Sequence, residues 1–145
     1  MLVVQGNLAN SYKVLGRIEE ALNLYRDVYS EELKLYGRHN KQTLESASNY
    51  AMTLLDLERF EEAKILLHKV APVAQRVCGA EHDLTLSLRE DLSRAILDGE
   101  SSAEEKREAL QMLEDTVAVM RRVFGPAHPE TLRAQRQLEH YRGSH

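Results

Sequence analysis

The chain has 145 residues, of which 43% are hydrophobic and 29% are charged, and this composition indicates a globular domain and not a disordered chain. Its formal net charge of −4 gives no support for nucleic-acid binding, which requires a clustered basic face. No apolar stretch approaches the length of a membrane span, and a single cysteine excludes a disulfide framework and a multi-cysteine metal site. We therefore expect a cytoplasmic protein that has no cofactor and that binds neither membrane nor nucleic acid.

Apolar residues at helical spacing predict seven helices and no strand. Leu, Ala, Glu and Arg dominate the chain, and β-branched runs with a period of two are missing, as is typical of an all-α protein. We expect the helices to stack as antiparallel pairs, with the third packing against the fourth. In chain order the predicted helices cover residues 2–15, 18–35, 41–57, 60–77, 83–98, 103–123 and 129–141.

One block of sequence recurs three times between the predicted helices. Gly37 and Gly79 are 42 residues apart, Gly79 and Gly125 are 46 apart, and a threonine that follows each glycine repeats both intervals. A fixed period of this size indicates a stacked-repeat protein. The three copies of the block are Tyr36–Leu44, Cys78–Leu86 and Phe124–Leu132.

Each block has residues that end one helix and begin the next. Its glycine tolerates the left-handed conformation in which helices commonly end. Asn40 is a good N-cap because its side-chain oxygen can accept from free amides of the following helix. Pro129 occupies the same region of the last block and suits the first position of a helix. The blocks therefore predict sharp helix boundaries.

The second helix of each unit begins with a matching alanine. Ala21 and Ala63 are 42 residues apart and Ala63 and Ala109 are 46 apart, so the extra residues of the third unit lie between its two helices. They fall within residues 99–102, where Gly99 can end one helix. This insertion is predicted to be a longer loop and not a broken repeat. Two capping boxes can begin the helix after it, either Ser101 with Glu104 or Ser102 with Glu105.

The pattern resembles the tetratricopeptide repeat, especially its long, 42-residue variety in kinesin light chains and in arrays attached to some nucleotide-binding signalling ATPases. A Gly-x-x-His-Pro-x-Thr header, complete at 125–131, and the Glu-Ala start of the second helix carry the resemblance. The chain departs from the family pattern at Asn40, which replaces the histidine, at Lys41 and Asp83, which replace the proline, and at Glu58, which replaces a turn glycine.

This resemblance implies an all-α, right-handed α-solenoid of about three and a half stacked helix-turn-helix units. Residues 143–145 are interpreted as a remnant of cloning or of a tag. The predicted units are 1–35, 36–77, 78–123 and a partial unit, 124–142, which together form one solenoid over 1–142.

In this family the first helices of successive units line a concave groove that holds extended peptides. Amide side chains at one equivalent position could bind a peptide backbone, or they could serve a neighbouring helix or water. Gly6 and Glu90 stand where other members have lysines, so we expect no clamp for a terminal carboxylate. The predicted groove residues are the equivalent set Asn7, Asn49, Asp91 and Gln137, together with Asn10, Met52, Asp56 and Arg94.

No Gly-rich phosphate loop, nucleophile elbow or zinc signature occurs, so we expect no enzyme. The sequence predicts a protein–protein interaction scaffold that binds a peptide or partner segment in the groove. The alternative is a structural spacer or self-association module of a larger multidomain protein, either a motor adaptor or a nucleotide-binding signalling ATPase. Because Leu132 and Leu138 lie on a last helix without a partner helix, we also expect copies to associate end to end.

Overall fold

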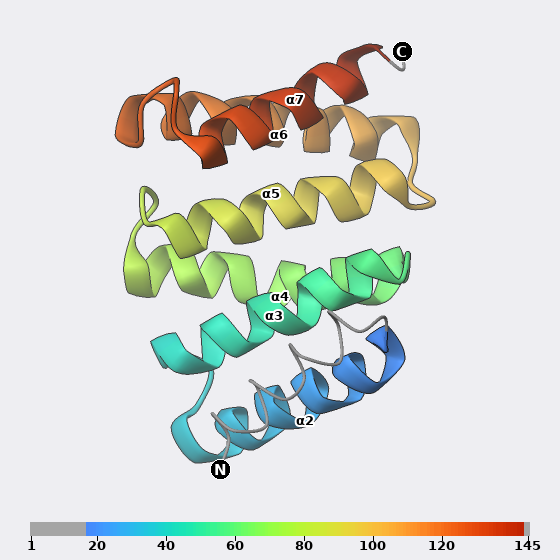
Figure 1. Ribbon diagram of the computed structural model, residues 1–145, viewed down its shortest axis with the longest axis vertical. Helices are drawn as coiled ribbons and strands as arrows, with labels where there is room; N and C mark the ends of the chain where they lie inside the picture. Colours follow the sequence, from blue (N-terminus) through green and yellow to red (C-terminus); the bar gives the residue numbers. More distant parts are fainter. Residues whose placement is uncertain (1–16, 144–145) are drawn as a thin grey trace.

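The computed structural model describes residues 17–143, where all regular structure is helical (Figure 1). Six helices begin and end within two residues of their predicted bounds, and the predicted helix at 2–15 lies outside the described residues. Within 17–143 there is no strand, as the sequence predicts. In chain order the helices are α2 (Ile18–Tyr36), α3 (Lys41–Asp56), α4 (Phe60–Cys78), α5 (Asp83–Asp98), α6 (Ala103–Val123) and α7 (Pro129–Gly143).

The helices are stacked in the order in which they occur in the chain. Each helix from α2 to α6 packs against the one that follows it, and α3 also packs against α5. The contact of α3 with α4 confirms the predicted pairing of the third and fourth helices. Figure 1 shows α3, α5 and α7 running in the same direction through the stack. These three helices, the first of each pair, therefore form a parallel row that positions the candidate site.

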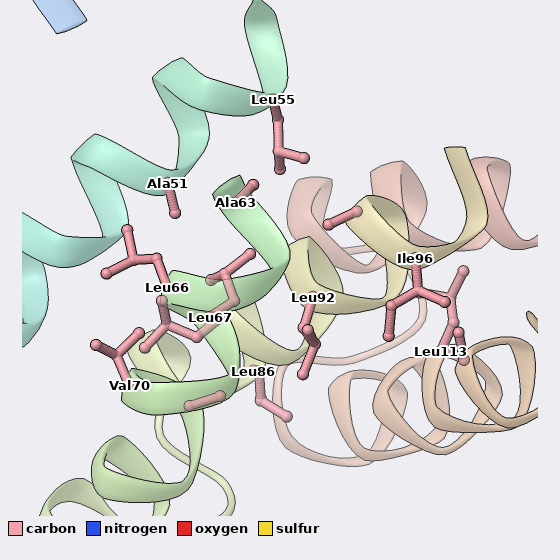
Figure 2. Packing of buried hydrophobic residues seen from close by; sticks show 14 of the residues in the cluster. Ala51, Leu55, Ala63, Leu66, Leu67, Val70, Leu86, Leu92, Ile96 and Leu113 are labelled. Carbon is pink, nitrogen blue, oxygen red and sulfur yellow. The ribbon is translucent and has the colours of Figure 1, made fainter. Parts of the chain in front are cut away.

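One large hydrophobic cluster extends through the stack from α2 to α7. Ala51 of α3 and Ala63 of α4 are fully buried within it, and their small side chains let the helix backbones approach closely (Figure 2). Larger side chains such as Leu67 and Leu86, also fully buried, fill the space around these contacts. These two alanines thus mark positions where helices pack closely.

The glycine of each block adopts the left-handed backbone conformation that the sequence predicts. A Cβ added at any of the three glycines would meet nothing within 4 Å, so glycine is required by the backbone conformation and not by lack of space. The φ angles are 82° at Gly37, 100° at Gly79 and 96° at Gly125.

The residue before each first helix caps it. Asn40 Oδ1 accepts from the backbone amide of Gln42 at 2.8 Å, which confirms the predicted N-cap of α3. His82 Nδ1 and His128 Nδ1 each accept a backbone amide from two residues later, at 3.1 Å. An asparagine and two histidines therefore serve the same role in the three blocks.

Two of the three block threonines connect a first helix to the helix before it. Thr43 Oγ1 donates to the backbone carbonyl of Glu32 at 3.4 Å, and Thr131 Oγ1 donates to that of Met120 at 3.3 Å. Both bonds span 11 residues of sequence, so they are equivalent. Thr85 Oγ1 is buried and has no hydrogen-bond partner among the described residues. The threonine repeat thus fixes how successive units meet, and its middle copy lacks the bond.

The two connections within units differ. Glu58 joins α3 to α4 at a φ of 58°, the only positive φ outside glycine in the described chain. The amide of Glu58 donates to the carbonyl of Leu55 at 3.0 Å and that of Arg59 to Leu54 at 2.9 Å, which is a Schellman motif. A glutamate therefore occupies the left-handed position where the family pattern has glycine, and it carries the strain that glycine would avoid.

In the longer loop between α5 and α6, glycine is required for a different reason. Gly99 has a φ of −90°, so the left-handed conformation does not explain it. A Cβ there would lie 2.7 Å from the carbonyl oxygen of Ala95 and 2.9 Å from Cβ of Phe60. Gly99 thus allows the end of α5 to contact the start of α4. Of the two predicted capping boxes, the one formed by Ser102 and Glu105 is present.

Candidate peptide-binding groove

The row of first helices carries a hollow at the helix N-terminal ends. It has a volume of about 500 Å³ and is lined by residues of all three helices and of the blocks before them. Because side chains spaced three and four residues apart share one helix face, the faces that line the hollow continue toward the C-terminal ends of the helices. Lining residues from the three helices include Lys41, Glu45 and Ser48 of α3, Asp83 and Ser87 of α5, and Glu130 of α7.

On α3 the predicted groove residues are exposed and uncharged over most of the face. Asn49, Met52 and Asp56 are all exposed to solvent, Met52 by 40%. The side chain of Asn49 makes no hydrogen bond to any residue of 17–143, so within that range it does not serve a neighbouring helix. Asn7 and Asn10, which the sequence places on the preceding first helix, lie outside the described residues.

On α5 the equivalent face is charged and half-buried. Arg94 Nε lies 3.6 Å from Asp98 Oδ2, and both side chains are about one-third exposed. Tyr141 of α7 also interacts with Asp98, and its pKa is raised by burial and by a hydrogen bond to that carboxylate. The end of α5 is therefore linked to α7 through Asp98.

Among the predicted groove residues, Asp91 has the pKa that is shifted most from its ordinary value. It is half-buried, and burial raises its pKa from the ordinary 3.8 to about 7. The neighbouring carboxylate of Glu90 contributes to this increase, while Arg133 and Arg94 oppose it. Asp91 makes no hydrogen bond or ion pair within the described residues. Its charge is therefore poorly compensated by the protein.

Glu90 is also part of this face, although the sequence placed it at a clamp position and not among the predicted groove residues. Its side chain is only 3% exposed, and its Oε1 accepts from Arg133 Nη2 at 2.8 Å. Arg133 Nη2 also donates to Glu130 Oε2 at 2.8 Å, so one guanidinium holds two carboxylates. Burial raises the pKa of Glu90, and Arg133 opposes this increase. Glu90 Oε2 is buried and accepts no hydrogen bond in the described chain.

On α7, Gln137 occupies the position equivalent to Asp91. The residue is half-buried, and its Oε1 is buried without a hydrogen-bond partner among residues 17–143. The equivalent set therefore changes along the row, from the exposed Asn49 to the half-buried Asp91 and Gln137.

Family models agree with this architecture over two parts of the chain. One model described as "Tetratricopeptide repeat" matches residues 1–70, and a second with the same description matches residues 100–130. The chain carries tetratricopeptide (TPR) repeats. This confirms the family resemblance predicted from the block and from the Glu-Ala element.

Solved structures show which TPR proteins the chain is similar to. One is a Podosopora anserina protein described as a kinesin light chain with nearly identical TPR-like repeats, which matches with a TM-score of 0.84 and 26% identity. A single-substitution variant of that protein matches with a TM-score of 0.77 and 26% identity. Each match covers 97% of this chain and 64% of the other, so the chain spans less than two thirds of either protein. No curated protein matches the sequence.

Among the helices of residues 17–143, none is both long and apolar enough to cross a lipid bilayer. Over the same residues, no three His, Cys, Asp or Glu side chains gather where they could hold a metal ion.

A second hollow lies between α2, α3 and α4, away from the predicted groove residues. Its volume is about 550 Å³, and its lining is largely apolar, with Leu33, Ile65 and Val73 among its residues. Ile65 is 52% exposed, although it lies within an amphipathic helix. This α2–α4 hollow is the main rival to the groove as a binding surface on the TPR stack.

Proposed function

We propose that this TPR stack is a non-enzymatic scaffold that binds an extended segment of a partner protein along the row formed by α3, α5 and α7. In the same proposal the units form a right-handed solenoid of about three and a half repeats, with the row on its concave side. TPR arrays are generally protein-interaction modules, which supports a protein as the partner. The observation that carries the proposal is the hollow of about 500 Å³ that crosses all three helices.

The dimensions of the row suit a short peptide. Packed helices lie roughly 8–10 Å apart. Because α3 packs against α5, and Arg133 of α7 contacts Glu90 of α5, we take the row to span roughly 20 Å. An extended chain advances roughly 3.3 Å per residue, so about six residues would cross the row. Along that path the peptide backbone would meet the exposed amide of Asn49, which can both donate and accept.

The proposal can be tested with peptides selected on the protein itself. Dodecapeptides displayed on phage would be selected against the full chain, and the tightest would be synthesised and measured by titration calorimetry. We expect Asn49→Ala to weaken binding by about 1 kcal/mol or more, because a peptide hydrogen bond is lost. Asn23→Ala on α2 is the matched control, since Asn23 is equally exposed and lies outside the row. Equal affinities of the wild type and Asn49→Ala would contradict the proposal.

A second candidate function, self-association, is favoured by the apolar surface at the α6–α7 end of the stack. A hollow of about 720 Å³ opens there between α5, α6 and α7, with Leu97, Leu110 and Tyr141 in its lining. Leu132 of α7 is also 40% exposed. Sedimentation equilibrium over a concentration series tests this candidate. Leu110→Glu should reduce association if this end is the contact, and a mass that stays monomeric at all concentrations would exclude it.

A further inference from the structure

Three hydrogen-bond acceptors of α5 and α7 have no hydrogen-bond donor among residues 17–143. Glu90 Oε2 and Gln137 Oε1 are both buried without a partner among the described residues. The carboxylate of Asp91 is half-buried and makes no hydrogen bond or ion pair in the same range. Because buried acceptors are nearly always satisfied in folded proteins, two unsatisfied ones beside a carboxylate without a partner in the same range point to a donor from outside residues 17–143.

The contacts of Arg133 show that these acceptors belong to one place. Arg133 of α7 donates to Glu90 of α5, so Glu90 lies at the junction of the two helices. Gln137 follows Arg133 by four residues and shares its helix face. Asp91 adjoins Glu90, and its carboxylate interacts electrostatically with both Glu90 and Arg133. We call Glu90, Asp91 and Gln137 the acceptor recess.

The acceptor recess adjoins the groove. Ser87 of α5 and Glu130 of α7 line the hollow, and Glu90 lies one turn after Ser87 on the same face. Arg133 bridges Glu130 and Glu90 directly. A peptide in the hollow would therefore have a side chain within reach of the recess.

The charge around the recess is negative and incompletely neutralised. The guanidinium groups of Arg94 and Arg133 are the two positive charges among residues 17–143 that act on the carboxylates of Glu90 and Asp91. Arg94 is shared with Asp98, and Arg133 is shared between Glu90 and Glu130. Four carboxylates of the described chain interact with these two guanidinium groups, and they belong to Glu90, Asp91, Asp98 and Glu130.

We propose that the acceptor recess binds the side chain of an arginine in the partner segment. A guanidinium has five N–H donors in a planar fork and no acceptor, so it can satisfy three acceptors at once. It also supplies the positive charge that the neighbouring carboxylates lack, and charge-assisted bonds of this kind are the strong ones. This inference rests on the proposed peptide-binding function and adds to it the chemistry of one residue of the ligand.

The probe for this site is a pair of short peptides. Each is an acetylated and amidated pentapeptide of four alanines around one central residue, either arginine or citrulline, which has nearly the same shape and no charge. Titration into the ¹⁵N-labelled full chain at about pH 8, where Asp91 is largely ionised, is followed by the shifts of its amide signals. We expect at least tenfold tighter binding of the arginine peptide, with the largest shifts in 87–94 and 133–141.

Two variants test the acceptors separately. Asp91→Asn removes the charge with little change of shape, and Gln137→Leu removes a buried acceptor. Each substitution should weaken the binding of the arginine peptide about tenfold or more. Glu108→Gln on the exposed face of α6 is the control, because it changes the net charge equally at a distance from the recess. Circular dichroism and thermal melting verify that each variant is folded.

The outcomes separate this inference from the proposed function. Equal binding of the arginine and citrulline peptides, or an arginine peptide that binds the wild type and Asp91→Asn equally, would overturn the arginine site. The absence of shifts with either peptide would overturn it as well. The selected dodecapeptides test the groove independently, so dodecapeptide binding that depends on Asn49 would leave the proposed function intact in each of these cases.

Discussion

The helices α3 and α5 are first helices of successive units, yet they present different surfaces from equivalent positions. Asn49 on α3 corresponds to Asp91 on α5, at the repeat interval of 42 residues. Asn49 is exposed and neutral, whereas Asp91 is half-buried with a raised pKa. The difference arises from what surrounds α5, because burial raises the pKa of Asp91 most and the carboxylate of Glu90 raises it as well, against the opposing effect of Arg133 on α7. A repeat thus fixes where a residue lies, while its neighbours decide its environment.

The ends of the same two helices differ as well. After α3, Glu58 takes a left-handed conformation that favours glycine. After α5, Gly99 is extended, and its missing side chain makes room for Phe60. The two connections show that the choice of glycine at a turn depends both on the backbone φ angle and on the room for a Cβ atom.

The largest expected effect comes from removing the charge at Asp91. In the folded state its pKa is about 7, against 3.8 ordinarily, so the folded protein holds this proton more tightly than the unfolded chain. Ionised Asp91 therefore destabilises the fold, and this penalty grows as pH rises from about 4 and levels off above about 7. We expect Asp91→Asn to raise the free energy of unfolding by about 3 kcal/mol at about pH 8 and by little below about pH 4.

Urea denaturation across this pH range measures the Asp91 effect, and the equivalent position on α3 supplies the control. Asn49→Asp introduces the same carboxylate at an exposed site, where we expect a change within about 0.5 kcal/mol. A gain from Asp91→Asn that does not vary with pH would contradict the account of Asp91.

The next largest expected change in stability comes from a substitution in the connection after α5. In Gly99→Ala the new Cβ would meet a backbone carbonyl at 2.7 Å and Phe60 at 2.9 Å, so the end of α5 must move away from α4. We expect a loss of about 2 kcal/mol in the free energy of unfolding, measured by urea denaturation. Glu100→Ala, next in sequence and exposed, should change stability little. A Gly99→Ala variant as stable as the wild type would show that the contact with Phe60 is dispensable.

Removing the side-chain amide of Asn49, on the exposed face of α3, should change peptide binding and not stability. Asn49→Ala should reduce the affinity for a selected dodecapeptide by about 1 kcal/mol and leave the helical circular dichroism signal unchanged. Asn49→Gln, which keeps the amide, should recover part of that affinity. Loss of helicity in Asn49→Ala would instead indicate a structural role for this residue.

The smallest expected effect concerns the connection after α3. Glycine relieves the left-handed strain of about 1–2 kcal/mol at Glu58 but costs about 0.5–1 kcal/mol of backbone entropy. We therefore expect Glu58→Gly to stabilise the protein by about 0.5–1 kcal/mol in thermal or urea unfolding. Glu58→Ala should give no such gain, because alanine retains the Cβ that makes this conformation unfavourable. Equal changes of stability in Glu58→Gly and Glu58→Ala would show that the left-handed conformation does not strain this position.

The sequence predicted the helices well because their signals are local. The block glycines, the cap of Asn40 and the box of Ser102 with Glu105 act within a few residues, and the structure contains all of them. The 46-residue interval also located the longer loop correctly. The sequence did not decide between the two capping boxes, since both have the required spacing.

The candidate site was predicted only in part because its interactions are not local. Glu90 and Arg133 are 43 residues apart, and only stacking brings them to 2.8 Å. The sequence indicated Glu90 only as a residue unsuited to a carboxylate clamp. Its distance from Arg133, close to one repeat, was the available signal. The raised pKa of Asp91 could not be derived from one helix face, since charged side chains of α3 and α7 also act on it.

The central claim is that the row of α3, α5 and α7 is the binding surface, and mapping one selected dodecapeptide by NMR tests it most directly. Amide shifts of the ¹⁵N-labelled chain would be followed as the peptide is added. The account predicts shifts on the shared faces of the row, around Ser48, Asn49, Ser87, Asp91 and Gln137, with α2 and α4 unaffected. Shifts confined to the α2–α4 hollow, around Leu33 and Ile65, would contradict it.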